Sequence, residues 1–98
     1  MVMTILEGRV VSEKWATLEQ AFLASSDSLP PPIAQSFLVQ GSDDPTVWRV
    51  ITLWRSRESL EAYRQSVETP GGVLMFRAAG TEPALSIFDV HAHVSGDA

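Results

Sequence analysis

The sequence predicts an α+β fold of the ferredoxin-like type, in which two helices cover one face of a four-stranded antiparallel sheet. Four segments alternate apolar and polar residues as strands do, and two segments repeat apolar residues at helical spacing. Their order along the chain is β-α-β-β-α-β. With 98 residues, the chain is long enough for one domain, residues 1–98, and too short for two separate cores.

The first strand and the first helix are predicted near the start of the chain. Residues 4–11 alternate between two faces, as a half-buried strand does. Ser12 is expected to cap a helix over residues 13–25. The apolar residues of that helix lie on one face, namely Trp15, Leu18 and Phe22.

A hairpin is predicted in the middle of the chain. Residues 26–32 contain Asp27 and three consecutive prolines, which predict a stiff connection. Residues 33–40 and 46–54 read as strands, and the turn-forming run at 41–45 separates them. We therefore expect these two strands to pair antiparallel.

A second helix should follow, with Ser56 as its cap and with Leu60, Tyr63 and Val67 on its apolar face. The run at 69–72, Thr-Pro-Gly-Gly, is expected to stop the chain before a short helical turn over residues 73–79 that ends at Gly80. The fourth strand is predicted from residue 83 or 84 to residue 94.

Each predicted strand has large apolar residues on both sides, although two helices can cover only one face of a sheet. A second sheet is the natural cover for the other face, which predicts a homodimer. The space between the two sheets would then be able to hold a ligand.

Composition excludes several classes of function. The net charge of −5 and the dispersed basic residues argue against a nucleic-acid partner. We see no signal peptide and no apolar run of the roughly 20 residues that span a membrane, so a cytoplasmic protein without a membrane partner is expected. The chain has no Cys and no Gly-rich phosphate loop, so neither a thiolate metal site nor a nucleotide cofactor is indicated.

The run at 47–67, Val-Trp-Arg-Val-Ile-Thr-Leu-Trp-Arg-Ser-Arg-Glu-Ser-Leu-Glu-Ala-Tyr-Arg-Gln-Ser-Val, resembles the strand-to-helix junction of the antibiotic-biosynthesis-monooxygenase (ABM) family in the dimeric α+β barrel superfamily. The resemblance implies that Trp54, at the end of the strand, points into a pocket. It also implies a cofactor-independent monooxygenase-like protein that binds a small hydrophobic or aromatic, phenolic molecule.

Three aromatic or basic residues of this run are candidate substrate contacts. Trp54 shares a strand face with Trp48, so either could contact a ligand or simply pack in the core, and Trp48 is expected at the rim or in a dimer contact. Arg49 could bind a carboxylate or phenolate, as could Arg9 and Arg55, but such residues more often pair with surface acids, and Glu7 is the nearest partner for Arg9.

Tyr63, His91 and His93 are the candidate catalytic residues. Tyr63 could donate a hydrogen bond to a substrate oxygen or be a core residue. His91 and His93 are predicted on one face of the last strand beside Asp89, where one could act as a base. They could also be solvated edge residues or, with the spacing of half a metal site, ligands.

Two features depart from the family pattern. The chain contains no Asn, whereas the haem-degrading members and the best-understood monooxygenases rely on an Asn near the Trp. Tyr63 also stands where several relatives have a His, which argues against haem degradation. Two functions therefore stay open, a monooxygenase-like enzyme and a dimeric small-ligand-binding or interaction domain without catalysis.

Overall fold

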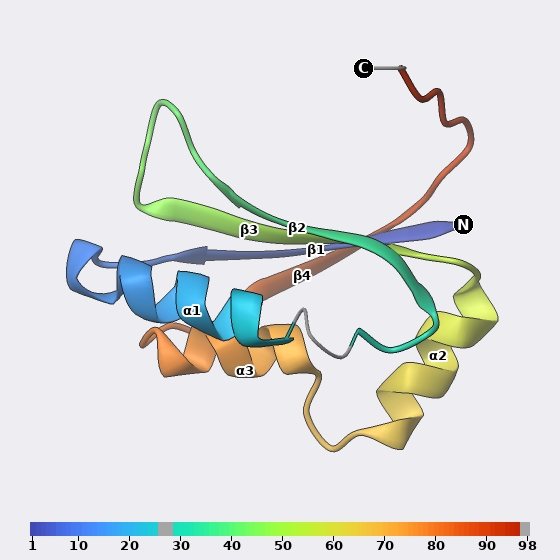
Figure 1. Ribbon diagram of the computed structural model, residues 1–98, viewed down its shortest axis with the longest axis horizontal. Helices are drawn as coiled ribbons and strands as arrows, with labels where there is room; N and C mark the ends of the chain where they lie inside the picture. Colours follow the sequence, from blue (N-terminus) through green and yellow to red (C-terminus); the bar gives the residue numbers. More distant parts are fainter. Residues whose placement is uncertain (26–28, 97–98) are drawn as a thin grey trace.

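The computed structural model describes residues 1–25 and 29–96 and places its three α-helices on one face of a four-stranded antiparallel sheet (Figure 1). The strands are β1 (Val2–Arg9), β2 (Ile33–Gln40), β3 (Val47–Trp54) and β4 (Ala84–Asp89). A 3₁₀ turn, η1 (Ser12–Lys14), precedes α1 (Trp15–Ser25), and α2 (Arg57–Ser66) and α3 (Gly71–Ala78) follow β3. The predicted ferredoxin-like order is confirmed, with α3 as an additional helix.

The strands lie in the order β2-β3-β1-β4, and every neighbouring pair is antiparallel. The predicted hairpin of β2 and β3 is therefore confirmed. The register aligns Ser36 with Thr52, Thr52 with Thr4, and Thr4 with Ile87. Because strand side chains alternate between faces, these four residues form one row across the sheet.

The main core lies where α1 and α3 pack side by side under one end of the sheet (Figure 1). Leu18 of α1 and Phe76 of α3 are fully buried there, which confirms the predicted apolar face of the first helix. A Cβ atom added at Gly8 of β1 would lie 2.8 Å from Cδ1 of Phe76. The glycine thus allows α3 to pack directly against the strand.

The predicted helical turn over residues 73–79 is confirmed as α3, but the prediction that the run at 69–72 stops the chain is wrong, because α3 begins within that run. Gly71 and Gly72 are instead the first two residues of α3 after Pro70. A Cβ at Gly72 would lie 2.6 Å from Cδ1 of Leu6. These glycines are therefore used for close packing of a helix start, where the first amides need no intrahelical partner. The predicted stop at Gly80 agrees with its φ of 85°.

The two predicted helix caps have different outcomes. Ser56 caps α2: its side chain accepts the Ser59 N–H, and the Ser59 hydroxyl accepts the Ser56 N–H. The prediction for Ser12 is wrong, because Ser12 is the first residue of η1 and the capping position belongs to Val11, which makes no side-chain cap.

The fourth strand is shorter than predicted. It ends at Asp89, which pairs with Val2, the first residue of β1. No residue of β1 before Val2 takes part in this pairing. Residues 90–94 therefore have no strand partner, although their apolar and polar residues alternate. The predicted stiff connection at 26–32 lies partly outside the described residues, since Asp27 is not among them.

The face of the sheet opposite the helices carries exposed apolar side chains, and no helix covers it in the described part of the chain (Figure 1). Phe37 of β2 is 47% exposed and Phe88 of β4 is 52% exposed. Ile5 and Ile51 lie between them in the same layer, because Phe37 pairs with Ile51 and Ile51 with Ile5. This face is the one for which a second sheet was expected.

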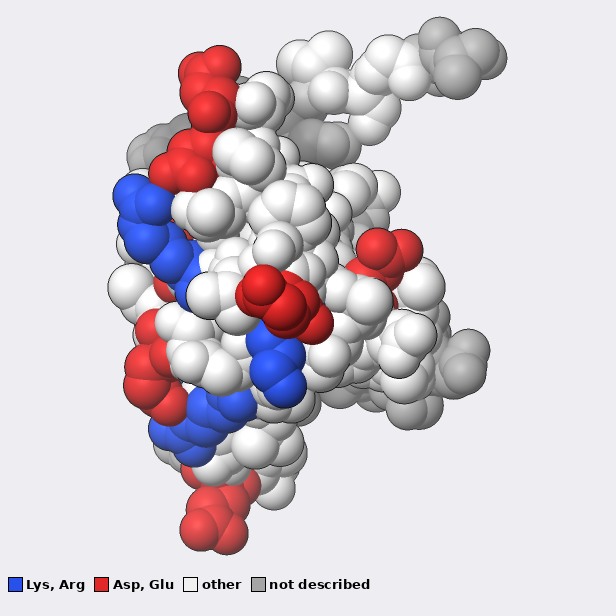
Figure 2. All heavy atoms as spheres, turned by 90° about the vertical axis from the view of Figure 1, so that its left-hand side faces the viewer, with Lys and Arg blue, Asp and Glu red and all other residues white. Residues whose placement is uncertain are grey.

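Charged residues form pairs and not a single basic surface. Figure 2 shows Lys and Arg side chains adjacent to Asp and Glu side chains on the face at the left of Figure 1. Among the described residues, Arg9 forms an ion pair with Asp44, and Arg77 forms one with Glu82. Among the residues that the structure describes, no helix is both long enough and apolar enough to cross a membrane.

Candidate functional site

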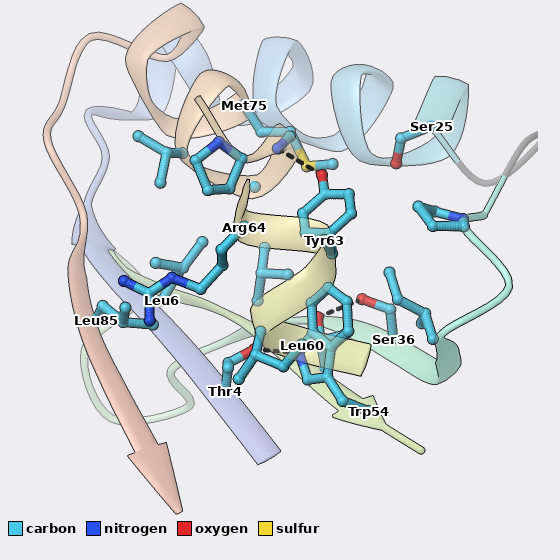
Figure 3. Close-up of a pocket in the computed structure, with 18 of the residues that line it drawn as sticks. Thr4, Leu6, Ser25, Ser36, Trp54, Leu60, Tyr63, Arg64, Met75 and Leu85 are labelled. Atoms are coloured by element: carbon cyan, nitrogen blue, oxygen red, sulfur yellow. Dashed lines mark hydrogen bonds between the residues drawn. The ribbon is translucent and has the colours of Figure 1, made fainter. Parts of the chain in front are cut away.

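A cavity of about 330 Å³ lies between the helix-covered face of the sheet and the helices (Figure 3). All four strands and all three helices contribute to its lining, which is mainly apolar. Trp54 lines this cavity, so its side chain faces the helices. The expected ligand space between two sheets would therefore not include Trp54, because its side chain lies on the helix-covered face.

Trp54 and Tyr63 form an aromatic pair along one side of the cavity. Trp54 is the last residue of β3, and Tyr63 lies on α2, two turns after the Ser56 cap. Their ring centroids are 5.1 Å apart and the ring planes are inclined by 44°. A tilted pair at this distance is a favourable aromatic arrangement. The short junction from β3 to α2 thus brings both rings to the same ligand space.

The Tyr63 hydroxyl has one proton available to the cavity. Its oxygen accepts the backbone N–H of Gly71 at 3.1 Å, which joins α2 to the start of α3. No described residue accepts the hydroxyl proton of Tyr63. Tyr63 could therefore donate a hydrogen bond to a ligand, as predicted, and its ring also packs against Trp54.

Arg64 also lines the cavity, although it is not among the site residues predicted from the sequence. Figure 3 shows its side chain extending from α2 toward Leu85 and Leu6. Its side chain is 43% exposed, and its ion pair with Glu61 is long, at 3.9 Å. Leu60 lies four residues earlier and lines the same cavity, so the helical spacing of Leu60 and Arg64 was the signal that could have identified it.

Hydroxyl groups form the floor of the cavity, which the strand pattern did not predict. The indole Nε1–H of Trp54 donates to Oγ1 of Thr4 at 2.9 Å. The hydroxyls of Ser36 and Thr52 are 3.0 Å apart and share a hydrogen bond. Thr4 is thus the partner of the strand-end Trp in a chain without Asn.

His91 and His93 do not line the Trp54 cavity. Both follow the end of β4, so their predicted place on the last strand is wrong. His91 borders a separate shallow hollow beside Met1 and Arg57, and His93 is exposed. Asp89 pairs with Arg57 at 2.7 Å, and this hydrogen bond is the main reason why the pKa of Asp89 is lowered. Neither imidazole is therefore positioned as a base for a ligand beside Trp54.

Trp48 is a core residue and not a rim residue. It is 7% exposed, its ring centroid lies 6.0 Å from that of Trp15, and it is absent from the cavity lining. It shares the inward face with Trp54, as predicted, but the α1 and α3 layer covers it. Sequence alone could not show which end of that face the helices fill.

The strand arginines pair at the surface. Arg49 donates to Glu7 at 2.6 Å on the outward face of the sheet, so it is directed away from the cavity. Glu7 is therefore the partner of Arg49 and not of Arg9, which pairs with Asp44 at 2.7 Å. Hydrogen bonds from Thr46, and then from Arg9, lower the pKa of Asp44 from 3.8 to about 2.

The chemistry of the cavity is limited by its side chains. Tyr63 and Arg64 are the ionisable groups in the described lining, which contains no carboxylate and no His. The described residues also include no group of three or more His, Asp or Glu suited to a metal ion. Haem iron is most often held by His or Cys, and the described lining has neither, so it does not fit a haem bound through either residue.

Comparison with known proteins agrees with this geometry. Residues 1–69 match the profile of the family described as antibiotic biosynthesis monooxygenase. A search of curated proteins finds no match.

Three solved structures illustrate the structural likeness. A candidate antibiotic biosynthesis monooxygenase from Deinococcus radiodurans is 12% identical, with full coverage of both chains and a TM-score of 0.73. SnoaB, a cofactor-independent oxygenase from Streptomyces nogalater, is 15% identical, with 97% of each chain covered and a TM-score of 0.69. A variant of MhuD with two manganese protoporphyrin IX molecules per active site is 21% identical, with 98% of this chain and 100% of that chain covered and a TM-score of 0.73. At these identities the likeness shows the fold.

Proposed function

The chain belongs to the antibiotic biosynthesis monooxygenase family, and from this premise we propose that its cavity binds a small aromatic phenol and promotes oxidation of that phenol by dioxygen without a cofactor. The observation that supports this proposal best is the apolar cavity of about 330 Å³ with the Trp54–Tyr63 pair at its side. Apolar cavities with a few directed polar groups are typical small-molecule sites. A flat aromatic ligand can pack against the two rings.

Tyr63 and Arg64 provide the polar contacts in this proposal. The free hydroxyl proton of Tyr63 can donate to a ligand oxygen, and the guanidinium of Arg64 favours the phenolate over the phenol. The proton of the phenol passes to solvent, because Arg64 is partly exposed and the described lining has no carboxylate or His to receive it. Trp54 and its apolar neighbours exclude water from the ring that reacts.

The reaction needs no external reductant. An electron-rich phenolate transfers electrons to dioxygen, one oxygen atom enters a ring carbon, and the other leaves as water while the phenol becomes a quinone. Phenol and dioxygen thus balance quinone and water. The protein contributes binding, orientation and stabilisation of the anion.

We further propose that a second copy of the chain covers the outward face of the sheet. Phe37 and Phe88 are exposed on that face, and exposed apolar patches of this kind mark association surfaces. The cavity lies on the opposite, helix-covered face of the sheet, so the second copy would not occupy it.

A second candidate function is ligand binding without catalysis. It is favoured by the composition of the described lining, which offers no side chain suited to be a general base near neutral pH. In this case the same cavity would bind an aromatic molecule and leave it unchanged.

Oxygen uptake separates the two candidates. Purified protein is mixed with dihydroxynaphthalenes in chelator-treated buffer, and dioxygen consumption is compared with that of the phenol alone and of the Trp54→Ala variant. Monooxygenase activity predicts faster uptake with the wild type, and formation of a quinone. Saturable binding without faster uptake across the panel would favour the non-catalytic binder, and a lack of binding would contradict both.

A further inference from the structure

We propose that Met75 limits the size of the ligand, so that the cavity accepts a phenol with two fused aromatic rings and excludes one with three. This inference rests on the proposed function and makes it more specific, because it names a residue that determines which phenols bind. Met75 lies on α3, outside the run at 47–67 in which the sequence indicated most of the site residues.

The first step is the volume of the cavity. An apolar protein cavity of about 150 Å³ holds one benzene ring. The cavity beside Trp54 has a volume of about 330 Å³, roughly twice as large, and therefore matches two fused rings. A ligand with three fused rings would have to extend into solvent or displace part of the wall.

The second step is to identify the walls that are fixed. Leu6, Val50 and Leu60 line the cavity and are buried members of the two apolar clusters of the domain. Trp54 is 5% exposed, and its ring packs against that of Tyr63 at 5.1 Å. Closely packed side chains of this kind do not move aside for a larger ligand without a loss of packing. These walls therefore stay in place when a ligand binds.

The third step is the position of Met75. Figure 3 shows Met75 on the helix side of the cavity, and Thr4 and Trp54 on the sheet side. Met75 is partly buried and packs against the main core without being one of its buried members. It is also the only unbranched apolar side chain in the described lining, and such side chains fill irregular gaps. Met75 thus determines how far a ligand extends toward α3.

The fourth step compares the side chain with the ring that it would exclude. Met75→Ala deletes Cγ, Sδ and Cε, which together are close in volume to the carbons that a third fused ring adds. The substitution leaves the Trp54–Tyr63 pair and the polar contacts of the proposed site in place. Loss of the Met75 side chain should therefore change the size of the preferred phenol and keep its chemical class.

A series of phenols that differ by one ring tests the limit. Dissociation constants are measured by fluorescence titration for phenol, 2-naphthol and 2-anthrol. We expect the wild type to bind 2-naphthol most tightly, because phenol leaves part of the cavity empty and 2-anthrol exceeds it. Met75→Ala should shift the ratio of the 2-anthrol and 2-naphthol dissociation constants about tenfold in favour of 2-anthrol, since a buried ring replaces a buried side chain.

Three further variants make the test specific to Met75. Met75→Phe enlarges the side chain and should move the preference from 2-naphthol toward phenol. Met75→Leu keeps an apolar side chain of similar volume, and Leu74→Ala shortens a side chain that is 52% exposed and absent from the described lining. Both of these controls should retain the wild-type ratios.

The outcomes separate the limit from the site itself. A wild type whose affinity rises with every added ring overturns the two-ring limit. A wild type that prefers 2-naphthol, with variants of Met75 that keep this preference, overturns the role of Met75. In both cases the aromatic site stands, whereas a wild type that binds none of the three phenols overturns the proposed function as well. Thermal unfolding identifies any variant that does not fold, and the other substitution at Met75 then decides.

Discussion

Removal of the Tyr63 hydroxyl is predicted to weaken both the fold and the binding of phenols. The Tyr63→Phe substitution keeps the ring that packs 5.1 Å from Trp54 and deletes the oxygen that accepts the Gly71 N–H. That hydrogen bond joins α2 to the first residue of α3, so its loss affects how the two helices are held beside the cavity.

The magnitude follows from a single hydrogen bond. Loss of such a bond costs about 0.5–1.5 kcal/mol of the free energy of unfolding. For a domain near 100 residues, 1 kcal/mol corresponds to roughly 4–8 °C in the melting temperature. The dissociation constant for a tetrahydronaphthol should rise about three- to tenfold because the hydroxyl also donates to the ligand.

Thermal unfolding and ligand titration of the same preparations provide the assay. Ser66→Ala is the matched control, because Ser66 lies on the same helix and its exposed hydroxyl donates only to the Tyr63 backbone carbonyl. We expect the control to stay within about 0.5 kcal/mol of the wild type. If Tyr63→Phe has the stability and the phenol affinity of this control, the assignment of Tyr63 is refuted.

Three further changes test other parts of the structure. Gly8→Ala places a Cβ 2.8 Å from Phe76, so overpacking should lower the free energy of unfolding by about 1–3 kcal/mol in urea denaturation; an unchanged midpoint would show that the contact relaxes freely. The pKa of Asp44 is lowered to about 2, so its contribution to stability is present above about pH 4 and is lost as the pH falls toward 2. The difference in unfolding free energy between wild type and Asp44→Asn should shrink over that range, and a constant difference would contradict the stabilisation of the Asp44 carboxylate by hydrogen bonds from Thr46 and Arg9. Phe37→Glu puts a charge on the outward face, so light scattering should detect a shift from dimer toward monomer, whereas a wild type that is already monomeric would overturn the dimer proposal.

Local patterns in the sequence predicted most elements of the fold. The bounds of β2 and the Ser56 cap agree with the structure, since turn-forming residues and a side-chain hydroxyl determine them locally. The extension of the last strand to residue 94 failed, because its end depends on where β1 begins. The start of α3 was also missed, since a Gly-Gly pair is typical of a helix break and the close contact of Gly72 with Leu6 is not visible in the sequence.

The candidate site was predictable only in part. Trp54 was identified because the family resemblance implies that the strand-end Trp points into a pocket, and Tyr63 because helical spacing places it on the apolar face of the second helix. The hydroxyl floor was missed, since Thr4 and Thr52 are distant in the chain and meet only through the strand register. The imidazoles were misassigned, because alternation along a strand predicts a face but does not show whether the strand continues.

The most direct test of the central claim is to follow the three tryptophan indole N–H resonances by NMR while 2-naphthol is added. Trp15 and Trp48 lie in or against the main core, and Trp54 lines the cavity. The account predicts a saturable shift of the Trp54 resonance, assigned with Trp→Phe variants, and little change in the other two. A Trp54 resonance that stays in place at saturating ligand, or shifts confined to Trp15 and Trp48, would contradict a ligand site beside Trp54.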